Sequence, residues 1–274
     1  MQQPAIQPME QFMIHKIVSL PTVHIGGLAV DLSITNSILS MMVGAVLLIA
    51  FFALTARREI VPNRGQALAE SLYNIIDRVL VGPIIGQEGK PYVPYILSLF
   101  LIILVLNLMS VVFAIGNLAG FDAAFAVTSQ LAITATLAIL TFVSVLVLGF
   151  IKHGPKFVSL FWVPGMGVFG GAAMVIIEMI SYFVRPVTLA LRLFGNMLGG
   201  HVVMSLFGSF VVALGILALS GGIATLAFVP SALSFAMIVG LTGLELVVAI
   251  LQAFVFAALA TVYLNEVVNF GHGH

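Results

Sequence analysis

Long uncharged apolar runs dominate this chain and restrict the environment in which it can fold. The run from Asn36 to Leu54 has about the ~20 residues that an α-helix needs to cross a bilayer, and further apolar runs follow it. Of the 274 residues, 61% are hydrophobic and 7% are charged, whereas soluble domains are about 25% charged. No soluble fold covers so much apolar surface, so we expect an all-α polytopic membrane protein.

Charged, proline-containing and glycine-containing segments separate the apolar runs. Residues 1–35 are mixed and predict an interfacial N-terminal segment, with a short amphipathic helix near residues 9–20 and then turn or extended structure. A single transmembrane domain is predicted at residues 36–270, with a tail at residues 271–274. Its five membrane-crossing helices are expected at about 36–55, 92–115, 127–151, 172–219 and 230–268.

The last two predicted spans are long for single crossings. The fourth holds more than twice the ~20 residues of a perpendicular span, so it either breaks near Gly199-Gly200 or lies strongly tilted. Gly221-Gly222 marks a reversal of the chain, and we expect the two long helices to pair antiparallel.

An amphipathic helix is predicted at about residues 64–80, with Asn63 as its N-cap. Leu68, Leu72 and Ile75 recur at helical spacing, with polar and charged residues on the other side. The segment is too polar to cross a bilayer, so we place it along the membrane surface. The alternative is a helix packed against the soluble part of another subunit.

Three charges interrupt the fourth span. Glu178, Arg185 and Arg192 stand seven residues apart, which places them on nearly one stripe of a helix, ~21 Å from first to last. A charge at bilayer depth costs ~2.5–3.5 kcal/mol on insertion scales. This stripe must therefore face protein or water rather than lipid, and it indicates an ion path.

Arg192 cannot itself pass a proton along, because an arginine stays protonated under essentially all conditions. Arg185 is two turns nearer to Glu178 than Arg192 is, so we expect it to be the ion-pair partner of Glu178. Arg192 is then left to find a carboxylate on another chain. On the last helix, Glu245 and Gln252 share a face, and an antiparallel pairing allows His201 to meet Glu245 as a titratable relay.

Structural roles are open for several of these residues. Glu178 and Arg185 can form a static buried pair, and His201 can serve as a helix-packing residue. Asn196 and Gln252 can form hydrogen bonds between helices. Gly195, Gly199 and Gly200 are expected to allow close helix packing rather than to act as hinges. Glu266, near the end of the chain, is expected to be solvated.

Composition and motifs exclude several other functions. A formal net charge of zero gives no electrostatic support for a nucleic-acid partner. Without cysteine there is no disulfide or thiolate metal site, and we expect neither a metal nor a cofactor. No HExxH, nucleophile-elbow or GxxxxGK[ST] pattern is present, so neither hydrolysis nor nucleotide binding by this chain is predicted.

The sequence resembles the a subunit of F-type ATP synthase at two distinctive motifs, RLFGNM at 192–197 and QAFVF at 252–256. The likeness extends to EMISYFVRPV at 178–187, to Asn107-Leu108-Met109 and to the amphipathic stretch after Val61-Pro62. It covers nearly the whole chain from Asn36.

The resemblance implies the stator half of a proton-driven rotor, a CF(0) component without catalytic activity of its own in the H+-transporting two-sector ATP synthase. Its partners would be a c-subunit ring, peripheral-stalk b subunits and the lipid bilayer, and its last two helices would be steeply tilted. Arg192 would face the ring carboxylates, separate two offset half-channels and block proton leak. The residues implied for the proton path are Glu178, Ser181, Asn196, His201, Glu245 and Gln252.

Two other classes of protein are weighed against this one. A self-contained ion-coupled transporter or channel would need internal repeat symmetry and a complete midplane site, and no inverted repeat is evident. A non-transporting membrane scaffold would not explain why the chain carries the free-energy cost of placing Arg192 at bilayer depth. The N-terminal stretch lacks a transit signature, which favours a bacterial plasma (inner) membrane over the alternative, a mitochondrial inner membrane.

Overall fold

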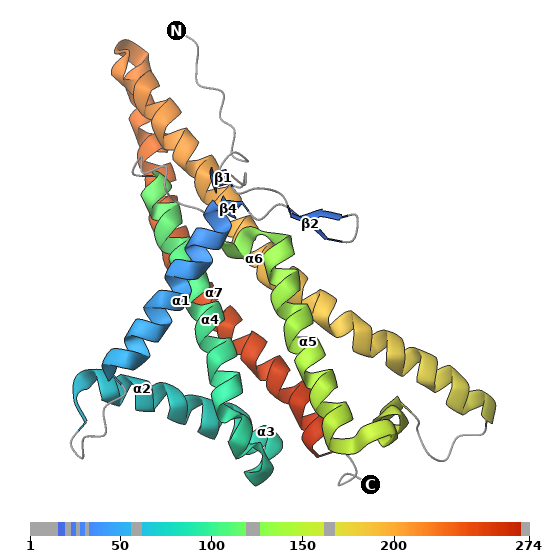
Figure 1. Ribbon diagram of the computed structural model, residues 1–274. Coiled ribbons are helices and arrows are strands. Elements are labelled where there is room, and N and C mark those ends of the chain that lie inside the picture. The colour runs from blue at the N-terminus through green and yellow to red at the C-terminus, as the bar shows by residue number, and fades with distance from the viewer. Residues whose placement is uncertain are drawn as a thin grey trace. The chain divides into compact units, whose positions relative to one another are not determined.

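Helices dominate the computed structural model, which describes residues 16–19, 23–25, 28–30, 33–55, 62–118, 127–161 and 168–269 (Figure 1). Five helical segments in these ranges are long and apolar enough to cross a membrane: Asn36–Thr55, Gln87–Val112, Leu131–Phe157, Ala173–Leu219 and Thr225–Val268. The predicted fold class, an all-α polytopic membrane protein with about five crossings, is confirmed.

The α-helices in chain order are α1 (Asn36–Thr55), α2 (Arg64–Ile75), α3 (Gly82–Ile85), α4 (Val93–Leu118), α5 (Leu131–His153), α6 (Val168–Leu219) and α7 (Phe228–Val268). A π-helical segment, η2 (Ile76–Val81), joins α2 to α3. The 3-10 segments are η3 (Gln87–Tyr92), η4 (Val127–Ser129), η5 (Gly154–Phe161) and η6 (Gly222–Ala227).

The chain divides into two compact units, one of residues 1–48, 104–130 and 194–251, the other of residues 49–103, 131–193 and 252–274. In the first unit, Val111, Met197 and Ala249 form a buried apolar cluster. In the second, Val145, Phe157 and Val267 do so. The expected division into an N-terminal segment, a single transmembrane domain and a tail stays a prediction.

The N-terminal segment contains strands in place of part of the predicted helix. β1 (Lys16–Val18) pairs antiparallel with β4 (Ile34–Thr35), and β2 (Val23–Ile25) pairs antiparallel with β3 (Leu28–Val30). The helix predicted near residues 9–20 is therefore wrong at 16–18, and most of its remainder lies outside the described residues. The β-branched side chains of this stretch favour the extended pairing with Ile34.

The amphipathic segment begins at α2 with the predicted cap, because the side-chain oxygen of Asn63 accepts a hydrogen bond from the Gln66 amide at 2.9 Å. Leu68, Ile75 and Val79 are exposed, whereas Ile76 is fully buried. This segment thus keeps an apolar stripe on its outside, as a helix lying in a membrane interface does.

α6 is continuous over 52 residues, so the break considered near Gly199-Gly200 does not occur. Breaking a helix in hydrocarbon leaves backbone groups without partners, at several kcal/mol each, whereas a glycine in a helix costs only ~1 kcal/mol. At 1.5 Å per residue the helix is ~78 Å long, more than twice a ~30 Å hydrocarbon core.

Side chains from α5 bind the carboxyl end of α7. Lys152 Nζ donates to the Val268 carbonyl at 2.8 Å and lies 3.4 Å from Glu88 Oε2. His153 Nε2 donates to the Val267 carbonyl at 2.7 Å. The positive charge of Lys152 at this end of the helix also complements the helix dipole. The last turn of α7 is thereby held within the second unit.

Candidate functional site

Arg192 lies on the outward face of α6. Its side chain is exposed, as are those of Val187 and Leu191, whereas Leu189 and Leu193 are buried. Within the described part of the chain, no carboxylate lies at ion-pair distance from its guanidinium, and no hydrogen bond to it is formed. Arg192 is therefore a fixed positive charge on an exposed part of α6 for which the described residues supply no counter-charge.

Asn196 and Ser181 are also exposed on α6. Ser181 belongs to the second unit, as Arg192 does, and Asn196 to the first. Gln252 in α7 is buried, and no hydrogen bond joins it to Arg192.

Arg185 lies at the centre of a charged cluster in the second unit, with two carboxylates and two aromatic rings around it. Its Nη1 lies 2.5 Å from Oε2 of Glu266, and its Nη2 lies 3.7 Å from Oε1 of Glu178. The guanidinium carbon stands 5.1 Å from the Tyr182 ring centre and 5.3 Å from that of Tyr263, within range for cation–π attraction.

Glu266 was missed as a site residue, because its place near the chain end suggested a solvated side chain. It is instead the closest partner of Arg185, with its side chain 31% exposed. Two signals point to it: α7 runs on to Val268, and Glu266 follows Tyr263 by three residues, on the same helix face.

His201 and Glu245 meet in the first unit, contributed by α6 and α7. His201 Nε2 lies 3.8 Å from Glu245 Oε1, and the side chains are only 2% and 5% exposed. One turn further along, the Thr242 hydroxyl donates to Met204 Sδ at 3.5 Å. The pair is therefore enclosed by packed helices, and an ionisable pair enclosed at membrane depth is a candidate functional site.

Asn107 in α4 forms a hydrogen bond to this region of α7. Its Nδ2 donates to the Ala249 carbonyl at 3.1 Å, and the side chain is fully buried. The Asn107 Oδ1 accepts no hydrogen bond from a described residue. Asn107, which lies inside a span and needs a hydrogen-bond partner, thus finds it in the Ala249 carbonyl, one turn beyond Glu245.

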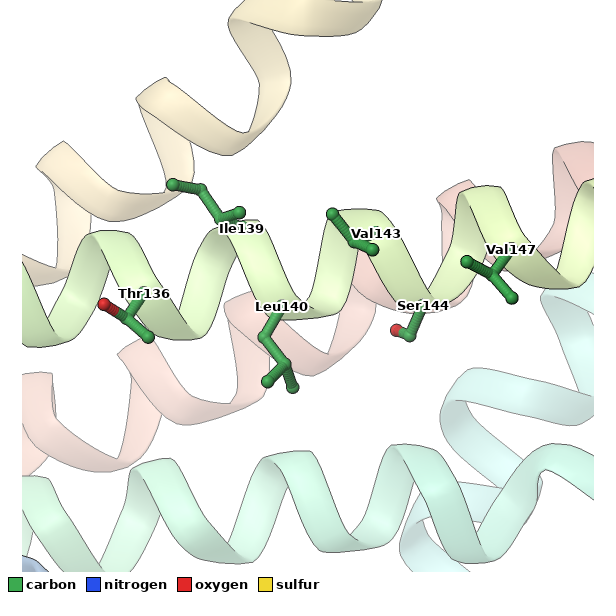
Figure 2. Close-up of a pocket in the computed structure, with 6 residues that line it drawn as sticks. All are labelled: Thr136, Ile139, Leu140, Val143, Ser144 and Val147. Atoms are coloured by element: carbon green, nitrogen blue, oxygen red, sulfur yellow. The ribbon is translucent and has the colours of Figure 1, made fainter. Parts of the chain in front are cut away.

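A depression of about 490 Å³ runs along α5 (Figure 2). It is lined by Thr136, Ile139, Leu140, Val143, Ser144 and Val147. The Thr136 hydroxyl donates to its own helix, and Ser144 bonds to Tyr95. Such an apolar, open surface suits contact with lipid. No group of three His, Asp or Glu residues that could hold a metal ion is found among the described residues.

Fold and site together define a polytopic helical membrane protein whose two longest described helices, α6 and α7, carry Glu178, Arg185, Arg192, His201, Glu245 and Glu266. The sequence matches the family described as ATP synthase A chain over residues 38–265. The chain belongs to this family, the a subunits of ATP synthase.

Individual relatives match along almost their whole length. The ATP synthase subunit a of Rhodopseudomonas palustris (strain HaA2) is 40% identical over 268 residues, covering 98% of this chain and 100% of the relative. That of Azorhizobium caulinodans is 41% identical over 269 residues, covering 97% and 99%. That of Pelagibacter ubique (strain HTCC1062) is 38% identical over 269 residues, covering 98% and 100%.

Proposed function

We propose that this chain is the proton-translocating stator subunit of a rotary ATP synthase, with Arg192 facing the carboxylates of a c-subunit ring. Membership of the subunit a family supports a proton-channel subunit of such a machine. The observation that carries the finer proposal is the exposed guanidinium of Arg192, for which the described residues supply no carboxylate. A ring carboxylate on a neighbouring chain provides that counter-charge.

The proposed cycle moves one proton for each ring carboxylate that passes. A proton arriving through one half-channel binds the carboxylate, which becomes neutral and can rotate into lipid. Beside Arg192 only the ionised form is stable, so the proton leaves into the second half-channel. Since a guanidinium does not give up its own proton, Arg192 prevents direct leak between the channels. Each charge that crosses gains ~2.3 kcal/mol per 100 mV.

The polar residues divide between the two paths. We assign His201 and Glu245, with Asn196 and Gln252, to lining or gating one half-channel. Glu178 and Ser181 are assigned to polar channel positions, and Glu266 joins them because it shares Arg185 with Glu178.

The chain would work within a larger assembly. The c-ring and the peripheral-stalk b subunits are its proposed partners, and it binds no nucleotide itself. Its multi-pass helices and bacterial relatives support a place in the bacterial plasma membrane.

Substitution of Arg192 tests the proposal. In membrane vesicles that carry the complete synthase, Arg192→Ala should abolish proton-driven ATP synthesis, while c subunits still co-purify with the mutant chain. Normal synthesis in this variant would remove Arg192 from the mechanism. Ion transport by the purified chain alone in liposomes would favour a self-contained transporter.

A further inference from the structure

We infer that Gly200 is a positioning residue for the carboxylate of Glu245, because the missing side chain at position 200 leaves the space that this carboxylate occupies against α6. The inference deepens the proposed function and depends on the role given there to Glu245.

The space at Gly200 is too small for any other residue while Glu245 keeps its place. A Cβ atom added to Gly200 would lie 2.6 Å from Oε1 and 3.0 Å from Cδ of Glu245. Oε1 is also the atom that lies 3.8 Å from His201 Nε2. A single methyl group would therefore push away the oxygen that faces the histidine.

The same methyl group should leave the fold intact. The atoms it would meet are the far end of a flexible side chain, so the carboxylate can move while the backbone stays in place. Alanine is also a better helix former than glycine, and Gly200 lies inside α6. A Cβ at Gly195 or Gly199 meets nothing within 4 Å in the described chain, so the contact with Glu245 is specific to position 200 within this glycine cluster.

The first experiment places Gly200→Ala in the complete synthase and measures ATP-driven proton pumping in vesicles, normalised to the amount of assembled complex. Assembly should equal that of the wild type, and pumping should fall about tenfold or more, since a displacement of ~1 Å can cost ~100-fold in rate. The matched control is Gly215→Ala in the same helix, where the new Cβ would stand 3.7 Å from Ser231 Oγ, an ordinary contact. It should pump at the wild-type rate.

The second experiment is a rescue. Aspartate is shorter than glutamate by one methylene, so Glu245→Asp withdraws the carboxylate from the added methyl group. The double variant Gly200→Ala/Glu245→Asp should pump several-fold faster than Gly200→Ala alone. A wild-type rate in Gly200→Ala, no recovery in the double variant, or a loss of assembly that Glu245→Asp does not restore would each overturn the inference.

Glu245→Gln separates this inference from the function on which it depends. Normal pumping by Glu245→Gln would refute the proposed role of Glu245 itself. Slow pumping by Glu245→Gln together with normal pumping by Gly200→Ala would refute only the positioning role of Gly200.

Discussion

His201 Nε2 lies 3.8 Å from Glu245 Oε1, beyond the ~3.2 Å of ordinary N–H···O hydrogen bonds yet within ion-pair range. Neither carboxylate oxygen of Glu245 accepts a hydrogen bond from a described residue. A buried carboxylate to which no described residue donates a hydrogen bond lowers the stability of the fold. A role of Glu245 in proton transfer would account for this loss of stability.

We therefore expect Glu245→Gln to reduce proton flux about tenfold or more without lowering the amount of assembled complex. The amide keeps the size of the side chain but cannot carry the proton as a carboxylate does. Passive proton flux through vesicles stripped of the catalytic sector measures the effect. Glu88→Gln, at a half-exposed carboxylate, is the control and should conduct normally. A fall in abundance alone would indicate a packing role for Glu245.

The contact between Arg185 and Glu266 should stabilise the chain. Charge-assisted hydrogen bonds contribute ~1.5–3 kcal/mol, and this pair stands at 2.5 Å with both side chains largely shielded. A double-mutant cycle with Arg185→Gln and Glu266→Gln should give a coupling of ~1–3 kcal/mol in the free energy of unfolding, measured by denaturation of the detergent-solubilised complex.

The pair between Lys152 and Glu88 is the matched comparison for that cycle. Its atoms are 3.4 Å apart, and the side chains are 37% and 52% exposed. Exposed pairs contribute ~0–1 kcal/mol, so its coupling should be clearly the smaller of the two. Equal couplings would show that burial does not strengthen the contact of Arg185.

Asn107 provides a test of the tie between α4 and α7. Asn107→Leu loses the bond to the Ala249 carbonyl but also removes a buried oxygen that accepts no hydrogen bond from a described residue, so the free energy of unfolding should change by less than ~1.5 kcal/mol. Asn107→Asp loses the donor and faces the carbonyl with an acidic group, and should cost more. Thermal denaturation of the complex compares the stability of the two variants. Equal losses of stability would contradict the conclusion that the Asn107 amide acts mainly as a donor to Ala249.

Arg192→Ala should leave the fold of this chain unchanged. Its guanidinium forms no hydrogen bond or ion pair with a described residue, and substitutions at such positions change stability by only ~0.5 kcal/mol or less. Protease resistance of the chain produced without c subunits measures this. A marked loss of protease resistance in Arg192→Ala would mean that residues of this chain interact with the Arg192 guanidinium.

Much of the fold follows from the sequence, because hydrocarbon leaves few alternatives to a helix. Uncharged runs such as 36–54 predict spans directly, and the boundary near Pro62-Asn63 follows from helix capping. The strand at Lys16–Val18 could not be predicted in this way, because its partner strand lies at Ile34–Thr35. A segment this short also fits the hydrophobic periodicity of a helix as well as that of a strand.

The site was harder to predict where it depends on pairing between distant parts of the chain. Glu178 and Arg185 share a helix face, so their proximity follows from spacing alone. Glu266 is 81 residues from Arg185, and only the register of α6 against α7 brings the two together. Local sequence does not determine that register.

The cluster around Arg185 has a consequence for charge balance. Glu178 and Glu266 bring two negative charges to one positive charge, so with both acids ionised the group keeps one surplus electron charge. A surplus of this kind on partly exposed side chains gives this part of the second unit a negative potential, which attracts cations and repels anions.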